Sequence, residues 1–343
     1  MADRIHGVAV DAGSGLAASL RDARGAAADS NDPVTFKRAV LEELGQGATT
    51  VLLDAEFGPG LLQSYPEGCT RMLAYEADVY KISNADRITI LPDDLSLEAF
   101  PDLGVGQLKF FMYYAPDDDP DLNARKHRIV EEIGARCRAV GVKFLMEPLV
   151  YHRTLEPGSR AYAEVKPDLV TRATETFAAD RFQVDVLKVE VPVDLAFVEG
   201  FGEPHMSRAQ ALDAFSRAAE PADGKDLVYL SAGVAFEAFE ASLELANEAG
   251  VDFSGFMCGR ALWSDAISIF GDAGETRLRA WLRDTGLYRL RRLIKAAACR
   301  PRPEQPKPAS WLLRCRRQAR SPHSDHRSSR SATGRQSRPR PTR

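Results

Sequence analysis

The chain has 343 residues, 44% of them apolar, which is enough for a sizeable core and within the reach of one α/β barrel. Its net charge of −4 combines an acidic body with a basic end: from Cys299 onward there are 13 Lys and Arg against two acidic residues, which leaves 32 basic and 47 acidic residues in 1–298. No stretch approaches the roughly 20 apolar residues that span a bilayer, and the N-terminus lacks the pattern of a signal peptide, so we expect a cytoplasmic protein with no membrane partner.

The cysteines and histidines give no sign of a metal site. The five cysteines are odd in number and widely spaced, and none forms a CxxC pair, so we expect reduced thiols. The six histidines are equally scattered, whereas a metal-dependent mechanism would group His and carboxylate ligands at short spacings. We therefore expect neither a metal nor another cofactor.

Eight short apolar runs alternate with longer amphipathic stretches through residues 1–298. The clearest helix-like stretches are 121–141 and 236–250, since each ends on a glycine. This alternation is typical of βα units, and eight of them predict an α/β fold with a single (β/α)8 barrel, a TIM barrel, rather than two open-sheet domains. The segment 79–106 receives no assignment. The runs are 7–13, 49–58, 71–78, 107–115, 142–151, 184–193, 227–234 and 253–261.

Residues 299–343 form a tail rich in Arg, Ser and Pro that is predicted to be disordered. One interpretation is a basic arm for nucleic acid or another anionic partner. The other is a dispensable extension, because the composition changes abruptly after "LIKAAA". We favour the second, and do not expect nucleic acid as a partner.

Catalytic side chains of a (β/α)8 barrel project from the carboxyl ends of its strands. The polar residues within the eight runs are therefore the candidates for chemistry. Two of them, Asp54 and Glu56, can equally cap the turn that follows their run. The candidates are Asp11, Asp54, Glu56, Glu76, Lys109, Glu147, Lys188, Glu190, Ser231 and Arg260.

Lys188 stands inside the apolar run "VDVLKVEVPV", where a lone ammonium group would be costly. A partly desolvated lysine near a second cation, such as Lys109, has a lowered pKa, and its free amine can attack a carbonyl carbon to form a Schiff base. Glu147, in the preceding run, is placed to shuttle protons for a hydroxyl group and for loss of water. For either lysine, a side chain that reaches solvent from the strand end, or one that pairs with a carboxylate such as Glu190, is an equally good interpretation.

Two stretches with small residues, "SAGV" and "CGRA", end the seventh and eighth runs. Small residues leave backbone N–H groups accessible, and Arg260 adds a cation. Because the loops after strands seven and eight are the common phosphate-binding place of this fold, the pair predicts a phosphorylated substrate.

Several longer motifs resemble the tagatose-1,6-bisphosphate aldolase family of class I aldolases, from about Gly7 to Lys295. They are "LLDAEFGPGLL", "KFFMYYAPDD", "VDVLKVEVPV…FVEGFGE", "YLSAGV", "FMCGRALWSDAI" and "WLRDTG", in this order. The resemblance implies a (β/α) barrel that cleaves a ketohexose bisphosphate to dihydroxyacetone phosphate and glyceraldehyde 3-phosphate through a lysine Schiff base.

The resemblance also implies roles for individual residues. By motif, Lys188 is similar to the Schiff-base lysine, Glu147 to the proton-transferring glutamate and Lys109 to the second lysine of the pocket. The residues expected to bind substrate are Asp11, for the hydroxyl groups, and Ser231, Gly233, Gly259 and Arg260, for the phosphate of the ketose.

The motif after the first run departs from the family pattern. Family members usually have an Asp-Gln-Arg-Gly-type run there, whereas this chain has "DAGSGL". Asp11 keeps the acid, but Ala12 stands at the glutamine position, so fructose 1,6-bisphosphate and a sulfonated or deoxy sugar phosphate stay open as substrates. A non-catalytic barrel that binds sugar phosphates is the alternative from another class, which the retained lysines and glutamate disfavour. A homo-oligomer is also expected.

Overall fold

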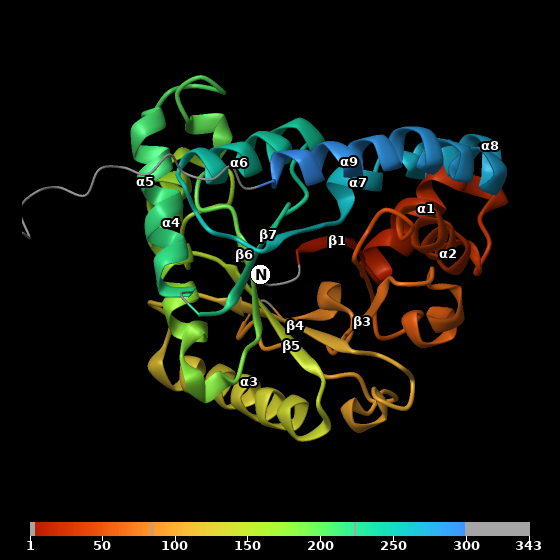
Figure 1. The fold of residues 1–343 in the computed structure, drawn as a ribbon, viewed down its shortest axis with the longest axis horizontal. Helices are drawn as coiled ribbons and strands as arrows, with labels where there is room; N and C mark the ends of the chain where they lie inside the picture. The colour runs from red at the N-terminus through yellow and green to blue at the C-terminus, as the bar shows by residue number, and fades with distance from the viewer. Residues whose placement is uncertain (1–3, 84, 223, 299–343) are drawn as a thin grey trace, which may run out of the picture. The chain divides into compact units, whose positions relative to one another are not determined.

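The computed structural model describes residues 4–83, 85–222 and 224–298, which form one closed barrel of eight parallel strands in sequence order. The strands lie in the middle of the molecule and the helices around them (Figure 1). The predicted (β/α)8 barrel is confirmed, and each predicted run overlaps one strand, although β1, β3 and β7 begin one or two residues before their runs. The predicted tail lies outside the described residues. The strands are β1 (Ile5–Val10), β2 (Thr50–Leu53), β3 (Thr70–Ala74), β4 (Gln107–Tyr114), β5 (Lys143–Val150), β6 (Val186–Glu190), β7 (Asp226–Leu230) and β8 (Gly255–Cys258).

Local sequence signals fix the ends of the best-predicted helices. The Asp119 side chain accepts hydrogen bonds from the first backbone N–H groups of α3, which ends at Gly141 with a φ of 73°. None of the described helices is long and apolar enough to cross a membrane. The helices are α1 (Ser14–Arg24), α2 (Asp32–Leu44), α3 (Pro120–Val140), α4 (Arg160–Ala178), α5 (Arg208–Ala219), α6 (Phe236–Glu248), α7 (Arg260–Trp263), α8 (Ala266–Trp281) and α9 (Leu287–Ala296).

The strands bury two apolar layers. Residues that face the helices join the main core, while a separate cluster of strand residues, which includes Leu145 and Val186, fills the barrel interior. Since alternate residues of a strand face the same side, Glu147 and Lys188 continue this inward face toward the carboxyl ends. The barrel therefore has an apolar floor and presents polar side chains at its mouth.

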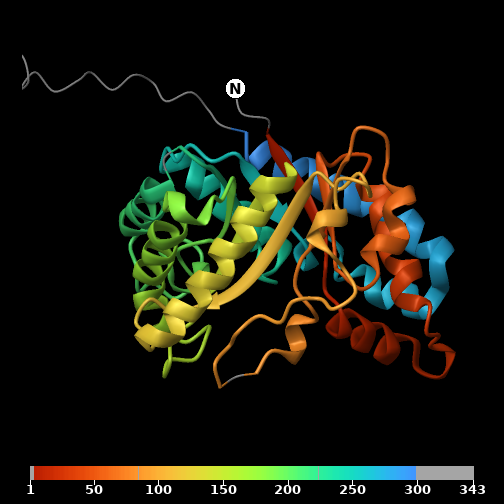
Figure 2. The same cartoon turned by 90° about the horizontal axis from the view of Figure 1, so that it is seen from below.

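The unassigned segment 79–106 forms the connection from β3 to β4. It contains two short 3-10 helices, Val79–Lys81 and Leu97–Ala99. Its first part, orange in Figure 2, extends beyond the barrel at the end toward which the arrow of β4 points. This segment therefore lies at the mouth of the barrel.

Gly134 marks a point where α3 must approach the chain closely. A Cβ added to Gly134 would lie 2.0 Å from the carbonyl oxygen of Phe182. Although Ala usually favours a helix by about 1 kcal/mol over Gly, we expect Gly134→Ala to lower the free energy of unfolding by about 1–3 kcal/mol, because α3 has to move outward. Urea unfolding measures the change. Gly60→Ala, whose Cβ meets nothing within 4 Å, should have little effect, and equal losses would contradict this explanation.

Candidate active site

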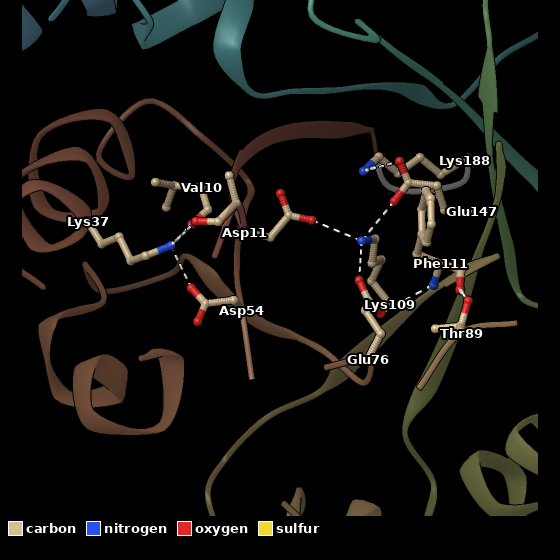
Figure 3. Close-up of polar contacts among 11 residues, drawn as sticks. Val10, Asp11, Lys37, Asp54, Glu76, Thr89, Lys109, Phe111, Glu147 and Lys188 are labelled. Atoms are coloured by element: carbon tan, nitrogen blue, oxygen red, sulfur yellow. Dashed lines mark hydrogen bonds and ion pairs between the residues drawn. The ribbon is translucent and has the colours of Figure 1, made fainter. Parts of the chain in front are cut away.

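Lys109 of β4 lies at the centre of a cluster of charged side chains at the barrel mouth (Figure 3). Its Nζ atom is 2.9 Å from Asp11 Oδ2 and 3.0 Å from Glu147 Oε2, and it also pairs with Glu76. The Lys109 side chain is almost fully buried. The structure thus brings together one ammonium group and three carboxylates: Lys109 and Glu147 lie within β4 and β5, and Asp11 and Glu76 follow the ends of β1 and β3.

Glu147 joins this cluster to Lys188. Its Oε1 atom is 2.9 Å from Lys188 Nζ, while its other oxygen contacts Lys109, so a single carboxylate lies between the two lysines. Lys188 thus pairs with a carboxylate, as the other interpretation of the sequence allowed, but the partner is Glu147, while Glu190 pairs with Lys166 at 3.6 Å. The three residues predicted to be catalytic are therefore in direct contact, and their roles stay predictions.

The surrounding charges set the protonation of the cluster. Burial alone would lower the pKa of Lys109, but Asp11, Glu147 and Glu76 outweigh it and raise that pKa well above its ordinary value. Burial would raise the pKa of Asp11, but Lys109 and Lys188 hold it far below its usual range. Lys109 is thus a permanent cation that keeps Asp11 ionised.

Glu76 belongs to the cluster, although the sequence analysis named it only as a polar residue of the run 71–78 and predicted no role for it. It contacts Lys109, and it also accepts a hydrogen bond of 3.2 Å from the backbone N–H of Phe111. Burial raises the pKa of Glu76 to about 7 against the opposing pull of Lys109. A carboxyl group in the apolar context "LAYEAD" was the available signal.

Lys37 of α2 fixes the end of β1 from outside the barrel. It is fully buried, and its Nζ atom donates to the carbonyl oxygens of Val10 (2.7 Å) and Ala12 (2.9 Å). It also pairs with Asp54 at 2.6 Å. Because the backbone is held on both sides of Asp11, this carboxylate has one position from which to reach Lys109.

Asp54 has a structural role. Its Oδ1 atom accepts hydrogen bonds from the backbone N–H groups of Glu56 (3.1 Å) and Phe57 (2.8 Å). The turn-capping interpretation of Asp54 is therefore confirmed, while the Glu56 side chain is exposed.

The loops after β7 and β8 meet beside the cluster. Ala232 and Gly233 have φ angles of 48° and 77°, so two successive residues adopt left-handed conformations after the buried Ser231. A Cβ added to Gly233 would lie 2.7 Å from a terminal nitrogen of Arg260, so the guanidinium covers this glycine. Gly259 immediately precedes α7, and the predicted phosphate-binding residues thus come from neighbouring loops.

A cavity of about 240 Å³ lies next to Asp11 and Glu76, between the ends of β1–β3 and the segment 79–106. One cation, Lys81, and seven carboxylates line this cavity, so it is poorly suited to a phosphate group. Within the described ranges, no group of three or more His, Cys, Asp and Glu residues has a geometry that could hold a metal ion. The acidic residues that line the cavity are Asp11, Asp54, Glu56, Glu76, Asp78, Asp93 and Asp94.

The model of the DeoC/LacD family of aldolases matches residues 7–265 of this chain. The chain belongs to this family. The tagatose 1,6-diphosphate aldolase of Listeria monocytogenes serotype 4b is 36% identical over 294 residues, which cover 85% of this chain and 86% of that protein. The tagatose 1,6-diphosphate aldolase of Staphylococcus haemolyticus is 39% identical over 254 residues, or 73% and 78% of the two chains. The resemblance seen in the sequence is confirmed, and the family is one of lyases.

Solved structures show the same fold at low sequence identity. A fructose-bisphosphate aldolase from Plasmodium falciparum, in complex with TRAP and an inhibitor, superposes with a TM-score of 0.63 at 15% identity and covers 85% of this chain and 89% of its own. An archaeal fructose-1,6-bisphosphate aldolase, whose catalytic Lys is covalently bound to a carbinolamine intermediate, has a TM-score of 0.54 at 14% identity and covers 85% and 93%. At these identities the likeness concerns the fold.

The buried Lys37–Asp54 pair predicts a large loss of stability when the cation is removed. Lys37→Met leaves the Asp54 carboxylate and two carbonyl groups without their donor, so we expect the free energy of unfolding to fall by about 3–5 kcal/mol. Urea unfolding measures this. In the double variant Lys37→Met/Asp54→Asn the loss should be smaller, since the uncompensated charge is gone. A single variant that stays as stable as the wild type would contradict the account.

The raised pKa of Glu76 predicts a pH dependence of stability. Its pKa is about 7 in the folded protein against an ordinary value of 4.5, so between these values the folded state binds more protons at Glu76 than the unfolded chain does. Protonated Glu76 therefore contributes its full stabilisation below pH 4.5, and this contribution is lost as the pH rises through about 7. Relative to Glu76→Gln, which cannot titrate, the wild type should lose at most about 1.4 kcal/mol per pH unit across this window. Urea unfolding at a series of pH values measures the free energy of unfolding of both proteins. If the two free energies changed in parallel with pH, the expectation would be wrong.

Proposed function

We propose that the protein is a class I aldolase that cleaves a ketohexose 1,6-bisphosphate to dihydroxyacetone phosphate and glyceraldehyde 3-phosphate. The observation that carries this proposal is Glu147, whose two oxygens lie 2.9 Å from Lys188 Nζ and 3.0 Å from Lys109 Nζ. The names of the curated relatives support tagatose 1,6-bisphosphate as the sugar, and those of the structural neighbours support a sugar bisphosphate.

The environments of the two lysines support Lys188 as the nucleophile. Lys109 contacts three carboxylates, which keep it protonated. Lys188 has a single ion-pair partner in the described part of the chain, Glu147, and can pass a proton to it. Lys188 is also nine-tenths buried, so its free amine is poorly solvated and next to a fixed cation. We therefore assign the nucleophile to Lys188.

Carbinolamine formation and dehydration come first. The Nζ atom of Lys188 attacks C2 of the open-chain ketose, a C–N bond forms as the C=O π bond breaks, and a second proton leaves the nitrogen for the carbonyl oxygen, which becomes a hydroxyl group. Glu147, which has received a proton from the amine, donates it to this hydroxyl group, and water leaves. The product is an iminium ion at C2 that withdraws electrons from the C3–C4 bond.

Cleavage then uses the same carboxylate. Glu147 takes the proton of the C4 hydroxyl group, the C3–C4 bond breaks, and its electron pair moves into the iminium to give an enamine. Glyceraldehyde 3-phosphate leaves as the aldehyde. Protonation of the enamine at C3 and hydrolysis by water release dihydroxyacetone phosphate and restore Lys188.

The remaining site residues hold the substrate in this scheme. Asp11 and Lys109 face the same space as Glu147 and bind hydroxyl groups of the sugar. The phosphate next to C1 lies against the loops after β7 and β8, where left-handed backbone and a guanidinium suit an anion. The residues proposed for this phosphate are Ser231, Gly233, Gly259 and Arg260.

A coupled assay of glyceraldehyde 3-phosphate release, with tagatose and fructose 1,6-bisphosphates in turn, tests the proposal. We expect turnover without added metal. Lys188→Ala should lower kcat by at least about 1,000-fold, since no other amine can form the iminium. Glu147→Gln should lower it by about 100- to 10,000-fold, because both proton transfers lose their carrier.

Lys225→Ala is the matched control, since Lys225 lies just before β7, at the opposite end of the barrel, and donates to the carbonyl oxygen of Val184. It should retain wild-type turnover. A folded wild-type protein that cleaves neither sugar, or a Lys188→Ala variant with undiminished activity, would contradict the proposed function.

A further inference from the structure

Arg87 lies at the barrel mouth, in the segment that joins β3 and β4. Its guanidinium carbon is 4.0 Å from the centroid of the Tyr151 ring and 5.4 Å from that of Tyr113. Within residues 4–298 as described, no hydrogen bond or ion pair involves this guanidinium. A stacked guanidinium keeps its N–H groups in the plane of the fork, free to bind an anion.

Tyr113 connects Arg87 with the candidate active site. Since alternate residues of a strand face the same side, Lys109, Phe111 and Tyr113 share the inward face of β4. Their contacts follow this order: Lys109 Nζ is 5.4 Å from the centroid of the Phe111 ring, which is 4.8 Å from that of Tyr113. Arg87 therefore ends a column of side chains that begins at Lys109.

The segment that carries Arg87 is anchored on both sides. The backbone N–H of Ala77 donates to the carbonyl oxygen of Ile90 at 2.7 Å, and the buried Thr89 hydroxyl donates to that of Phe111 at 2.7 Å (Figure 3). Arg87 itself has a φ of 50°, a left-handed conformation that is unfavourable for a residue with a Cβ atom. The guanidinium is thus held in place before any ligand binds, which lowers the entropy cost of binding.

The strands around the rim carry the proposed contacts in the order of the carbon atoms of the substrate. The loops after β8 and β7 receive the C1 phosphate, β6 carries Lys188 for C2, and β5 carries Glu147 for the C4 hydroxyl group. Arg87 stacks over the ends of β5 and β4, and so comes next in the same direction. In this order, the C6 end of an extended ketohexose would lie at the ends of β5 and β4, next to Arg87.

The charges near Arg87 suit a second phosphate better than those of the acidic cavity do. Lys126 of α3 is fully buried, with its Nζ atom 3.3 Å from the Tyr151 hydroxyl, and burial lowers its pKa to about 8, with a smaller contribution from Arg87. A phosphate dianion would further favour the charged form of this lysine. The charged side chains near Lys126 and Tyr151 are three cations, Arg87, Lys126 and Arg153, and two carboxylates, Asp86 and Asp118.

We propose that Arg87 binds the phosphate next to C6 and thereby makes the protein selective for ketose 1,6-bisphosphates over ketose 1-phosphates. This inference rests on the proposed function and names the residue that decides its substrate class. The C6 phosphate lies against the guanidinium edge that the Tyr113 and Tyr151 rings leave free. The acidic cavity beside Asp11 is not the place of either phosphate, because carboxylates dominate its lining.

The ratio of kcat/KM for a ketose 1,6-bisphosphate to that for the same ketose 1-phosphate tests the inference. The wild type should prefer the bisphosphate. Arg87→Met should lower this ratio by about 10- to 100-fold, the usual effect of losing a charge-assisted hydrogen bond. Arg87→Lys should lower it less, because it keeps the charge without the planar fork.

Lys81→Met is the matched control, since it removes one cation from the same segment and the Lys81 side chain is 72% exposed. It should leave the ratio unchanged. Arg87→Met should still cleave the ketose 1-phosphate, which would show that its active site is folded. An unchanged ratio in Arg87→Met, or an equal fall in Lys81→Met, would overturn the role of Arg87. A wild type that cleaves neither substrate would instead contradict the proposed function itself.

Discussion

The mouth of this barrel depends on one carboxylate shared by two buried lysines. Two ammonium groups next to each other would repel strongly in a poorly solvated site, because the effective dielectric constant there is low. Glu147 lies between them and contacts both. Asp11 and Glu76 add negative charge on the side of Lys109 alone. The carboxylates are therefore distributed unequally: Lys109 contacts three, whereas Lys188 pairs with one in the described part of the chain, and our proposal of Lys188 as the nucleophile rests on this inequality.

The rest of the fold maintains this inequality. The apolar interior of the barrel closes the floor beneath the cluster, and register across the parallel strands brings side chains from separate strands to one level. Lys37 holds the end of β1 through its contacts with Val10 and Ala12, so that Asp11 faces Lys109 rather than Lys188. The acidic cavity and the Arg87 stack then give the mouth two electrostatically different sides. In the proposed function, this difference would orient a phosphorylated sugar by charge before any bond changes.

Much of this architecture follows from periodicity in the sequence. Eight apolar runs separated by amphipathic stretches predict the barrel, and polar residues within those runs predict Lys109, Glu147 and Lys188. Other features depend on tertiary contacts that periodicity does not encode. Lys37 shares a helix face with Val40, Leu41 and Leu44, but its carbonyl partners lie at the end of β1 and just after it. Arg87 lies in a segment without apolar period, and its aromatic partners are distant in the chain.

Borohydride reduction with dihydroxyacetone phosphate, in the presence of a metal chelator and followed by peptide mass mapping, tests the central claim most directly. The account predicts a covalent adduct on Lys188 and none on Lys109, because three carboxylates keep Lys109 protonated. The adduct should disappear in Lys188→Ala. An adduct on Lys109, or the absence of any adduct in protein shown to be folded, would contradict the assignment of Lys188 as the Schiff-base lysine.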